Sequence, residues 1–250
     1  MSGHSKWSTI KRKKAANDAR RGNLFTTLAR EITLAARAGG DPESNFGLRL
    51  AIDRARNNNM PKENIERAVR RGTGEDKEGA TIEQIEYEGY APHGVALVIE
   101  VVTDNRKRAV AEVRHILTRT GGNLAESGSV AWQFRRAAYF SIPAAGHDPE
   151  RVFELAVEAG ADDVQVGTDD IEILAPVEAF KQISDRLKEA GIHPQEAALK
   201  MMPTATIELK PEDALQVMRL VESLEELDDV QEVFTNLHVT EEAVALLETA

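Results

Sequence analysis

The fold is decided by residues 136–203, which read RAAYFSIPAAGHDPERVFELAVEAGADDVQVGTDDIEILAPVEAFKQISDRLKEAGIHPQEAALKMMP. Apolar residues alternate at both ends of this stretch, which predicts a strand at each end, and two short strands flank Gly167-Thr168. Helical spacing predicts one helix from Asp148-Pro149 to Gly160 and another that begins at Pro176. The side chains expected to face inward are Val152, Phe153, Ala156 and Ala159 in the first helix and Val177, Phe180, Ile183 and Leu187 in the second. The order βαββαβ is that of a ferredoxin-like domain.

The residues on either side of this stretch predict two parts of one more α/β domain. The expected elements are strands near 85–88 and 95–102, a helix at about 106–120, a strand with Val130, Trp132 and Phe134 on one face, a helix from Pro211 and a strand near 230–237. Four strands and two helices suffice for a two-layer sandwich. We therefore expect a discontinuous α/β sandwich domain, residues 77–135 and 204–250, into which the ferredoxin-like domain, residues 136–203, is inserted.

Residues 1–76 predict a helical domain. The expected helices cover 10–21 and 23–38, then a stretch after an N-cap at Ser44, and finally a stretch from Met60-Pro61 to Gly72. The glycine-containing and charged stretch 72–79 is a linker by composition. The predicted fold class is therefore α+β, with three domains: an N-terminal helical domain and two two-layer α/β domains, one inserted in the other.

The charge of the chain is divided unevenly. Residues 1–74 hold 16 Lys and Arg against 7 Asp and Glu, a net charge of +9, whereas residues 75–250 hold 15 against 35, a net charge of −20. Such asymmetry is typical of a chain with one end built for a polyanion. A helical domain with a solvated basic face is the alternative interpretation. The acidic body is expected to face away from the polyanion, or toward a basic protein partner.

The basic residues are densest before and within the first predicted helix. The candidate nucleic-acid-binding residues are Lys6, Trp7, Lys11, Arg12, Lys13, Lys14, Arg20 and Arg21. Lys and Arg on such an arm can follow a phosphate backbone. An exposed Trp7 could stack on a base, but a Trp7 that anchors the arm on its own domain is an equal alternative.

Signatures of catalysis and of cofactor binding are absent from the sequence. It contains no cysteine, no phosphate-binding loop, no dinucleotide-binding glycine motif and no pair of histidines at a spacing of four. We therefore predict no catalytic residue, no cofactor and no metal site. No run approaches the roughly 18 apolar residues that span a bilayer, so we expect a cytoplasmic protein without a membrane partner.

Short motifs along nearly the whole chain resemble those of one family. They are Gly3-His4-Ser5-Lys6-Trp7, Asp18-Ala19-Arg20-Arg21-Gly22, Phe25-Thr26, Arg30-Glu31, Asn59-Met60-Pro61-Lys62, Arg71-Gly72-Thr73-Gly74, Tyr87-Glu88-Gly89-Tyr90, Thr103-Asp104-Asn105-Arg106, Gly121-Gly122-Asn123-Leu124 and Gly128-Ser129-Val130-Ala131-Trp132. In this order they resemble the YebC/PmpR family, of which the mitochondrial translational activator of cytochrome oxidase is a distant relative.

The resemblance implies a three-domain α/β protein with a helical N-terminal domain and no enzymatic activity. It also implies a DNA-binding transcriptional regulator, for which a homodimer is a further hypothesis because dimers commonly read repeated half-sites. Members of the family also look like translation factors that act on ribosomes, including at proline-rich stalls. Contact with ribosomal RNA or tRNA is therefore the alternative, because charge alone does not distinguish duplex DNA from folded RNA.

Overall fold

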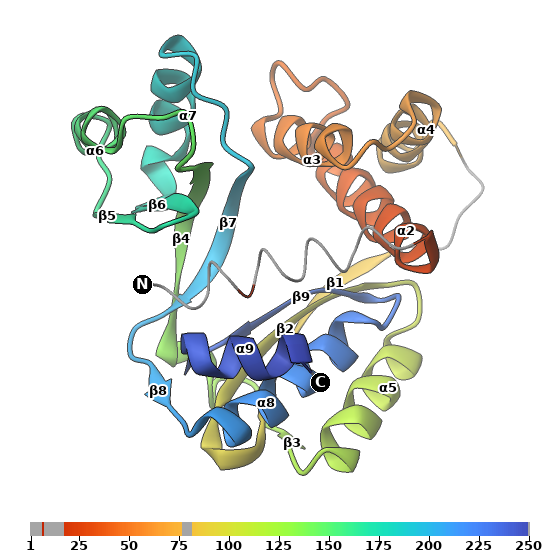
Figure 1. The fold of residues 1–250 in the computed structure, drawn as a ribbon. Helices are drawn as coiled ribbons and strands as arrows, with labels where there is room; N and C mark the ends of the chain where they lie inside the picture. Colours follow the sequence, from red (N-terminus) through yellow and green to blue (C-terminus); the bar gives the residue numbers. More distant parts are fainter. Residues whose placement is uncertain (1–6, 8–17, 77–81, 250) are drawn as a thin grey trace. The chain divides into compact units, whose positions relative to one another are not determined.

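The computed structural model describes residues 7, 18–76 and 82–249 of the 250-residue chain (Figure 1). The chain forms two compact parts. Residues 18–130 and 216–235 are called the N-terminal part here, and residues 131–215 and 236–249, together with Trp7, are called the insert part. Both combine helices with antiparallel sheet, which confirms the α+β class. In the described ranges no helix has the length and apolar character needed to cross a membrane.

Three helices and a short 3-10 turn begin the N-terminal part. They are α2 (Asp18–Ala35), η1 (Ala36–Ala38), α3 (Phe46–Asn57) and α4 (Lys62–Thr73). Their core is formed mainly by Leu28, Ile32, Leu48, Ile52 and Ile65. The prediction of a new helix at residue 23 was wrong, because α2 runs without a break through Gly22. The N-cap of α3 is Asn45 rather than Ser44, since the Asn45 side chain accepts a hydrogen bond from the Leu48 amide at 3.1 Å.

Gly72 allows α2 and α4 to approach closely. We predicted that Gly72 ends the fourth helix, but α4 continues to Thr73, and Gly74, with φ of 78°, caps it in the left-handed conformation. A Cβ atom on Gly72 would lie 2.3 Å from the carbonyl oxygen of Thr33 and 2.5 Å from the Cβ of Ala36. The glycine at this position is therefore explained by helix packing, not by turn geometry.

We expect Gly72→Ala to lower the free energy of unfolding by about 1–3 kcal/mol, because α2 would have to move to relieve the overlap. Gly47→Ala is the matched control, since its added Cβ would meet only the Asn45 side chain at 3.6 Å. Because Gly47 lies in α3, Gly47→Ala should raise the free energy of unfolding by about 0.5–1 kcal/mol. Urea unfolding followed by circular dichroism measures both, and equal effects of the two changes would contradict the packing explanation.

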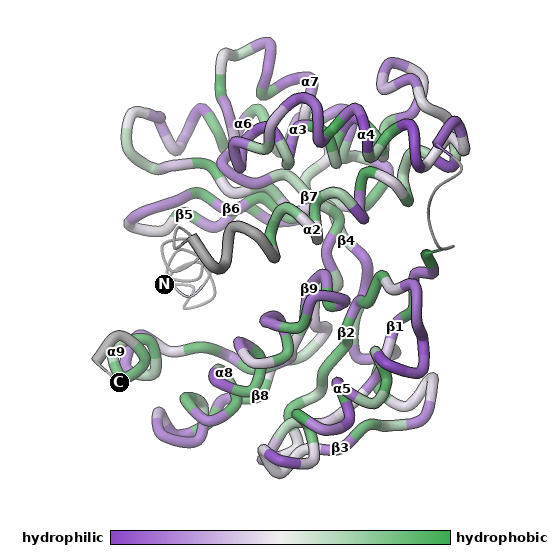
Figure 2. The backbone as a smooth tube through the Cα atoms, turned by 90° about the vertical axis from the view of Figure 1, so that its right-hand side faces the viewer, coloured by the Kyte–Doolittle hydropathy of each residue, from purple (hydrophilic) through white to green (hydrophobic). Residues whose placement is uncertain are grey.

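A four-stranded antiparallel sheet completes the N-terminal part. Its strands are β1 (Glu83–Tyr90), β2 (Ala96–Thr103), β3 (Asn123–Leu124) and β9 (Val230–Thr235), in the order β3-β1-β2-β9. The 3-10 turn η2 (Pro92–Gly94) lies between β1 and β2. Two helices accompany the strands, α5 (Arg106–Arg119) and α8 (Pro211–Glu225). The hydrophobic run of β2 appears as a green stretch of the tube in Figure 2. Because β2 pairs with β9, this sheet contains strands from before and after residues 131–215.

The third strand of this sheet was placed wrongly by the sequence. The expected strand at 130–134 does not form, and the two-residue β3 pairs with β1 instead. The Glu88 carboxylate accepts hydrogen bonds from the amides of Gly128, at 2.6 Å, and Val130, at 2.5 Å. A side chain therefore satisfies amides that a sheet ladder would otherwise bind. Trp132 lies in the 3-10 turn η3 (Ala131–Gln133), with 71% of its surface exposed.

The insert part contains the predicted ferredoxin-like plan. Its elements are β4 (Phe134–Pro143), α6 (Pro149–Glu158), β5 (Asp163–Val166), β6 (Asp170–Ala175), the 3-10 turn η4 (Val177–Ala179), α7 (Phe180–Glu189) and β7 (Glu196–Pro203), with strand order β5-β6-β4-β7. Phe140 of the sheet packs on Phe180, with ring centroids 4.7 Å apart. Phe153 was expected to face inward but is 49% exposed. The parallel pair β8 (Ile207–Glu208) and β10 (Leu237–His238), and the helix α9 (Glu241–Thr249), were not predicted.

Candidate nucleic-acid interface

Most of the predicted nucleic-acid-binding side chains lie outside the described residues. This applies to Lys6, Lys11, Arg12, Lys13 and Lys14. Arg20 and Arg21 belong to the first turn of α2, where the backbone alone is described.

Trp7 is described, and its side chain is 4% exposed. Stacking on a base requires an accessible ring face, which a side chain buried to this extent does not offer. Its role in binding nucleic acid stays a prediction.

Several basic side chains of the helices are engaged in ion pairs. Arg56 pairs with Asp53 at 3.4 Å and Lys62 with Glu66 at 3.6 Å, both in exposed positions. Exposed pairs of this kind contribute little to stability. Arg67, Arg70 and Arg71 of α4, by contrast, are exposed and form no ion pair with a described residue.

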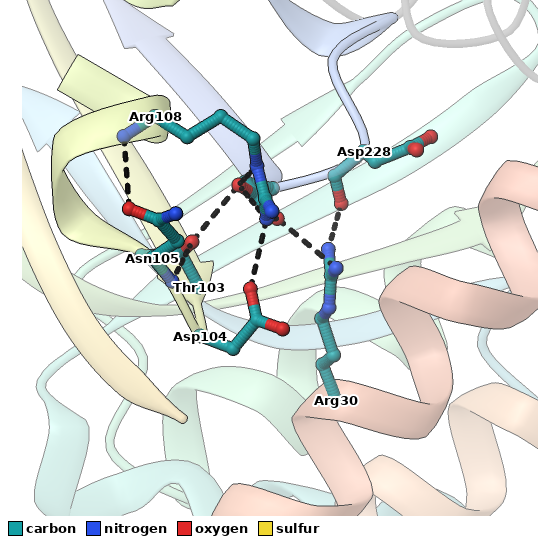
Figure 3. A network of polar contacts seen from close by, with 7 residues as sticks. Arg30, Thr103, Asp104, Asn105, Arg108 and Asp228 are labelled. Atoms are coloured by element: carbon teal, nitrogen blue, oxygen red, sulfur yellow. Dashed lines mark hydrogen bonds and ion pairs between the residues drawn. The ribbon is translucent and has the colours of Figure 1, made fainter. Parts of the chain in front are cut away.

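The buried carboxylate of Asp229 joins the helices to the sheet. Figure 3 labels its partners Arg30, Thr103 and Arg108. Asp229 precedes β9 and is 3% exposed as a side chain. One of its oxygens lies 3.0 Å from a guanidinium nitrogen of Arg30, which comes from α2. Arg30 also donates a hydrogen bond to the backbone carbonyl of Asp228. Arg30 of α2 therefore forms an ion pair with a carboxylate that is buried beside the sheet.

The sheet supplies the remaining partners of Asp229. Arg108 of α5 donates to it from Nε at 3.2 Å and from a terminal nitrogen at 2.8 Å, and the Thr103 hydroxyl donates at 2.9 Å. Hydrogen bonds to Asp229 and to Asp104 raise the pKa of the Arg108 guanidinium. Asn105 caps α5 and places Arg108 by accepting a hydrogen bond from its amide at 3.1 Å. Thr103, Asp104 and Asn105 belong to the motif Thr103-Asp104-Asn105-Arg106, but this network was not predicted from the sequence.

Glu31, next to Arg30, is a carboxylate with a perturbed pKa. Burial raises its pKa above the usual range, and Arg54, whose guanidinium lies 3.4 Å away, partly opposes this shift. Glu232 raises it further by repulsion. Because the folded-state pKa is raised, this carboxyl group contributes stability at acid pH that is lost as the pH rises through its folded-state pKa.

We therefore expect Glu31→Gln to change the pH dependence of stability. The difference in unfolding free energy between the variant and the wild type should grow in favour of the variant from about pH 4 to about pH 7. Urea midpoints measured across this range test the expectation. Glu43→Gln, at an exposed position, is the control, and a Glu31→Gln difference that does not vary with pH would contradict the assignment.

No metal centre was expected. Within the described ranges, histidines and carboxylates do not come together in groups of three or more that could hold an ion. The polar clusters of the N-terminal part are instead pairs of opposite charge, such as Arg30 with Asp229 and Arg54 with Glu31.

Comparison with known proteins places the chain in one family. A family model for the TACO1/YebC protein N-terminal domain matches residues 5–75, and a model for the TACO1/YebC second and third domain matches residues 82–237. Proteins named "probable transcriptional regulatory protein" are similar to it over 99% of both chains, with 48% identity in Pelodictyon phaeoclathratiforme and 51% in Chloroherpeton thalassium.

A solved structure agrees with these matches. The crystal structure of a conserved hypothetical protein from Aquifex aeolicus is 43% identical in sequence, and its TM-score is 0.83 over 90% of this chain and 93% of that one. The resemblance noted in the sequence is thus confirmed over nearly the whole length. The chain belongs to the TACO1/YebC family.

Proposed function

We propose that the chain is a non-enzymatic, cytoplasmic transcriptional regulator that binds DNA through its basic N-terminal helical domain, residues 1–76. The observation that carries the proposal is the net charge of +9 on residues 1–74 of a chain whose total charge is −11. The names of relatives similar over their full length support the regulatory role. Phosphate contacts by clustered Lys and Arg supply most of the affinity in such complexes.

The proposed contacts are those of the arm and of the start of α2. Lys6, Lys11, Arg12, Lys13, Lys14, Arg20 and Arg21 would neutralise phosphates, and Trp7 would support the arm or stack on a base. The acidic body would face away from the phosphate backbone of the nucleic acid or contact a basic protein. It comprises the discontinuous domain, residues 77–135 and 204–250, and the inserted domain, residues 136–203. Self-association to a homodimer would double the number of half-sites read.

Competition binding tests the proposal. The full chain is incubated at about 150 mM salt with fragmented genomic duplex DNA and with total RNA from the same cells, and the bound fraction is sequenced. Enrichment of a shared duplex sequence is expected. Retention of RNA alone, with duplex fragments at background, would reject the DNA-binding proposal.

The second candidate function is that of a ribosome-associated translation factor that contacts ribosomal RNA or tRNA and relieves stalled elongation, for example at proline-rich stretches. The observation that favours it is the match to models that also describe TACO1, together with the resemblance to a translational activator. In the same competition experiment this function predicts enrichment of ribosomal RNA or tRNA fragments.

A further inference from the structure

The N-terminal part contains a cavity of about 400 Å³, lined mainly by α2 and α4. Phe25 and Ala29 of α2 and Met60, just before α4, contribute apolar wall. Asn64 and Thr26 add polar groups. The volume lies within the range of sites that hold small molecules, and the mixture of apolar wall with a few polar groups is typical of them.

The cavity has an excess of positive charge. Arg67 and Arg71 line it from α4, one helical turn apart, and both are exposed without an ion pair to any described residue. Two like charges at this spacing repel each other on a helix surface. Arg30 also lines the cavity but is held by Asp229, and the lining carboxylate Asp104 is bonded to Arg108 at 2.9 Å.

Guanidinium groups next to an apolar wall match the chemistry of a nucleotide. A planar guanidinium binds phosphate oxygens in a bidentate manner. Aromatic and apolar side chains such as Phe25 accept the face of a base, and the amide of Asn64 offers one donor and one acceptor for a base edge. Together these groups can recognise a base and its phosphate.

We propose that this cavity binds one unpaired nucleotide of the nucleic acid that the chain contacts, with the phosphate on Arg67 and Arg71 and the base against Phe25 and Met60. A base inside a duplex keeps its faces stacked and its edge paired, and so does not enter a cavity. The inference rests on the proposed function and deepens it, because it predicts that the bound strand is single-stranded, looped or locally opened at this point.

Fluorescence anisotropy with the full chain tests the proposal. The probes are a labelled 12-nucleotide single strand, as RNA and as DNA, the matching DNA duplex, and the same single strands with abasic sites. Arg67→Gln combined with Arg71→Gln should weaken single-strand binding roughly 10-fold or more and lower its salt slope by roughly 0.7, the value for one lost phosphate contact. Binding of the duplex should change much less.

Two further variants separate the cavity from general charge. Arg56→Gln with Arg70→Gln removes the same charge from exposed positions of α3 and α4 that do not line the cavity. This variant should weaken single-strand binding less than about 3-fold. Ala29→Leu fills the cavity without a change of charge and should weaken single-strand binding, with no further loss when abasic sites replace the bases. The comparison of RNA with DNA identifies the source of the nucleotide.

Equal losses for the two arginine pairs, or single-strand binding unchanged by Arg67→Gln with Arg71→Gln, would overturn the cavity proposal. If the cavity proposal is overturned but the wild type still binds the duplex, the proposed DNA-binding function stands without the cavity. If the wild type binds none of the probes, both fall. If Ala29→Leu does not fold, the two arginine pairs decide the outcome by themselves.

Discussion

Replacing Lys11, Arg12, Lys13 and Lys14 with glutamine is expected to lower the salt dependence of nucleic-acid binding, reducing the slope of log K against log salt by roughly 3–4. Each neutralised phosphate contributes about 0.9 to that slope on duplex DNA through the release of counterions. Affinity at low salt should fall strongly as well, because the four side chains are the densest charge of the chain. Filter binding or anisotropy between about 50 and 200 mM salt measures the slope.

The control for this change lies on α5. Arg106, Lys107, Arg114 and Arg119 are four exposed basic residues outside residues 1–76, and their replacement by glutamine changes the net charge of the chain by the same amount. If binding depends on the arm, the control variant keeps most of the wild-type slope. A slope that is unchanged in the arm variant would remove the arm from the mechanism.

The second large effect concerns Asp229. We expect Asp229→Asn to lower the free energy of unfolding of the N-terminal part by ~3 kcal/mol, because it leaves Arg30 and Arg108 without the charge that both contact. This loss lies at the lower end of the range for a buried ion pair that loses one partner. The reason is that the Arg108 side chain is 42% exposed, so that water can partly replace the lost contact. Urea unfolding followed by circular dichroism measures the loss.

Asp228→Asn is the matched control for that prediction. Asp228 is exposed and contributes its backbone carbonyl to Arg30, which an asparagine retains. This variant should therefore lie within about 0.5 kcal/mol of the wild type, as exposed substitutions usually do. Similar losses in the two variants would show that local charge near β9, not the contact of Asp229 with the two arginines, stabilises this region.

The ferredoxin-like plan was predictable because its signals are local. Alternating apolar residues define β4, and Gly160 and Gly167 separate the elements that follow. Where the structure depends on distant contacts, the local signal failed. Val130 is buried, and its amide donates a hydrogen bond to the Glu88 carboxylate, 42 residues away in the sequence. Its spacing from the apolar Phe134 is that of a strand, and the sequence alone does not reveal the distant contact.

The candidate site was less predictable than the fold, for the same reason. The clustering of basic residues in the arm is visible in the sequence. The bond between Arg30 and the carbonyl of Asp228 joins positions 198 residues apart, and no periodicity relates them. The cavity beside Arg67 and Arg71 likewise requires the packing of α2 on α4, which Gly72 permits.

Crosslinking in growing cells tests whether residues 1–76 contact DNA. The full chain is crosslinked by ultraviolet light, the DNA and the RNA that remain attached are sequenced, and the attached peptides are identified. We expect promoter DNA to be enriched over background, with the crosslinks in residues 1–76. Ribosomal RNA enriched near a functional centre, with DNA at background, would contradict this expectation and make the chain a translation factor.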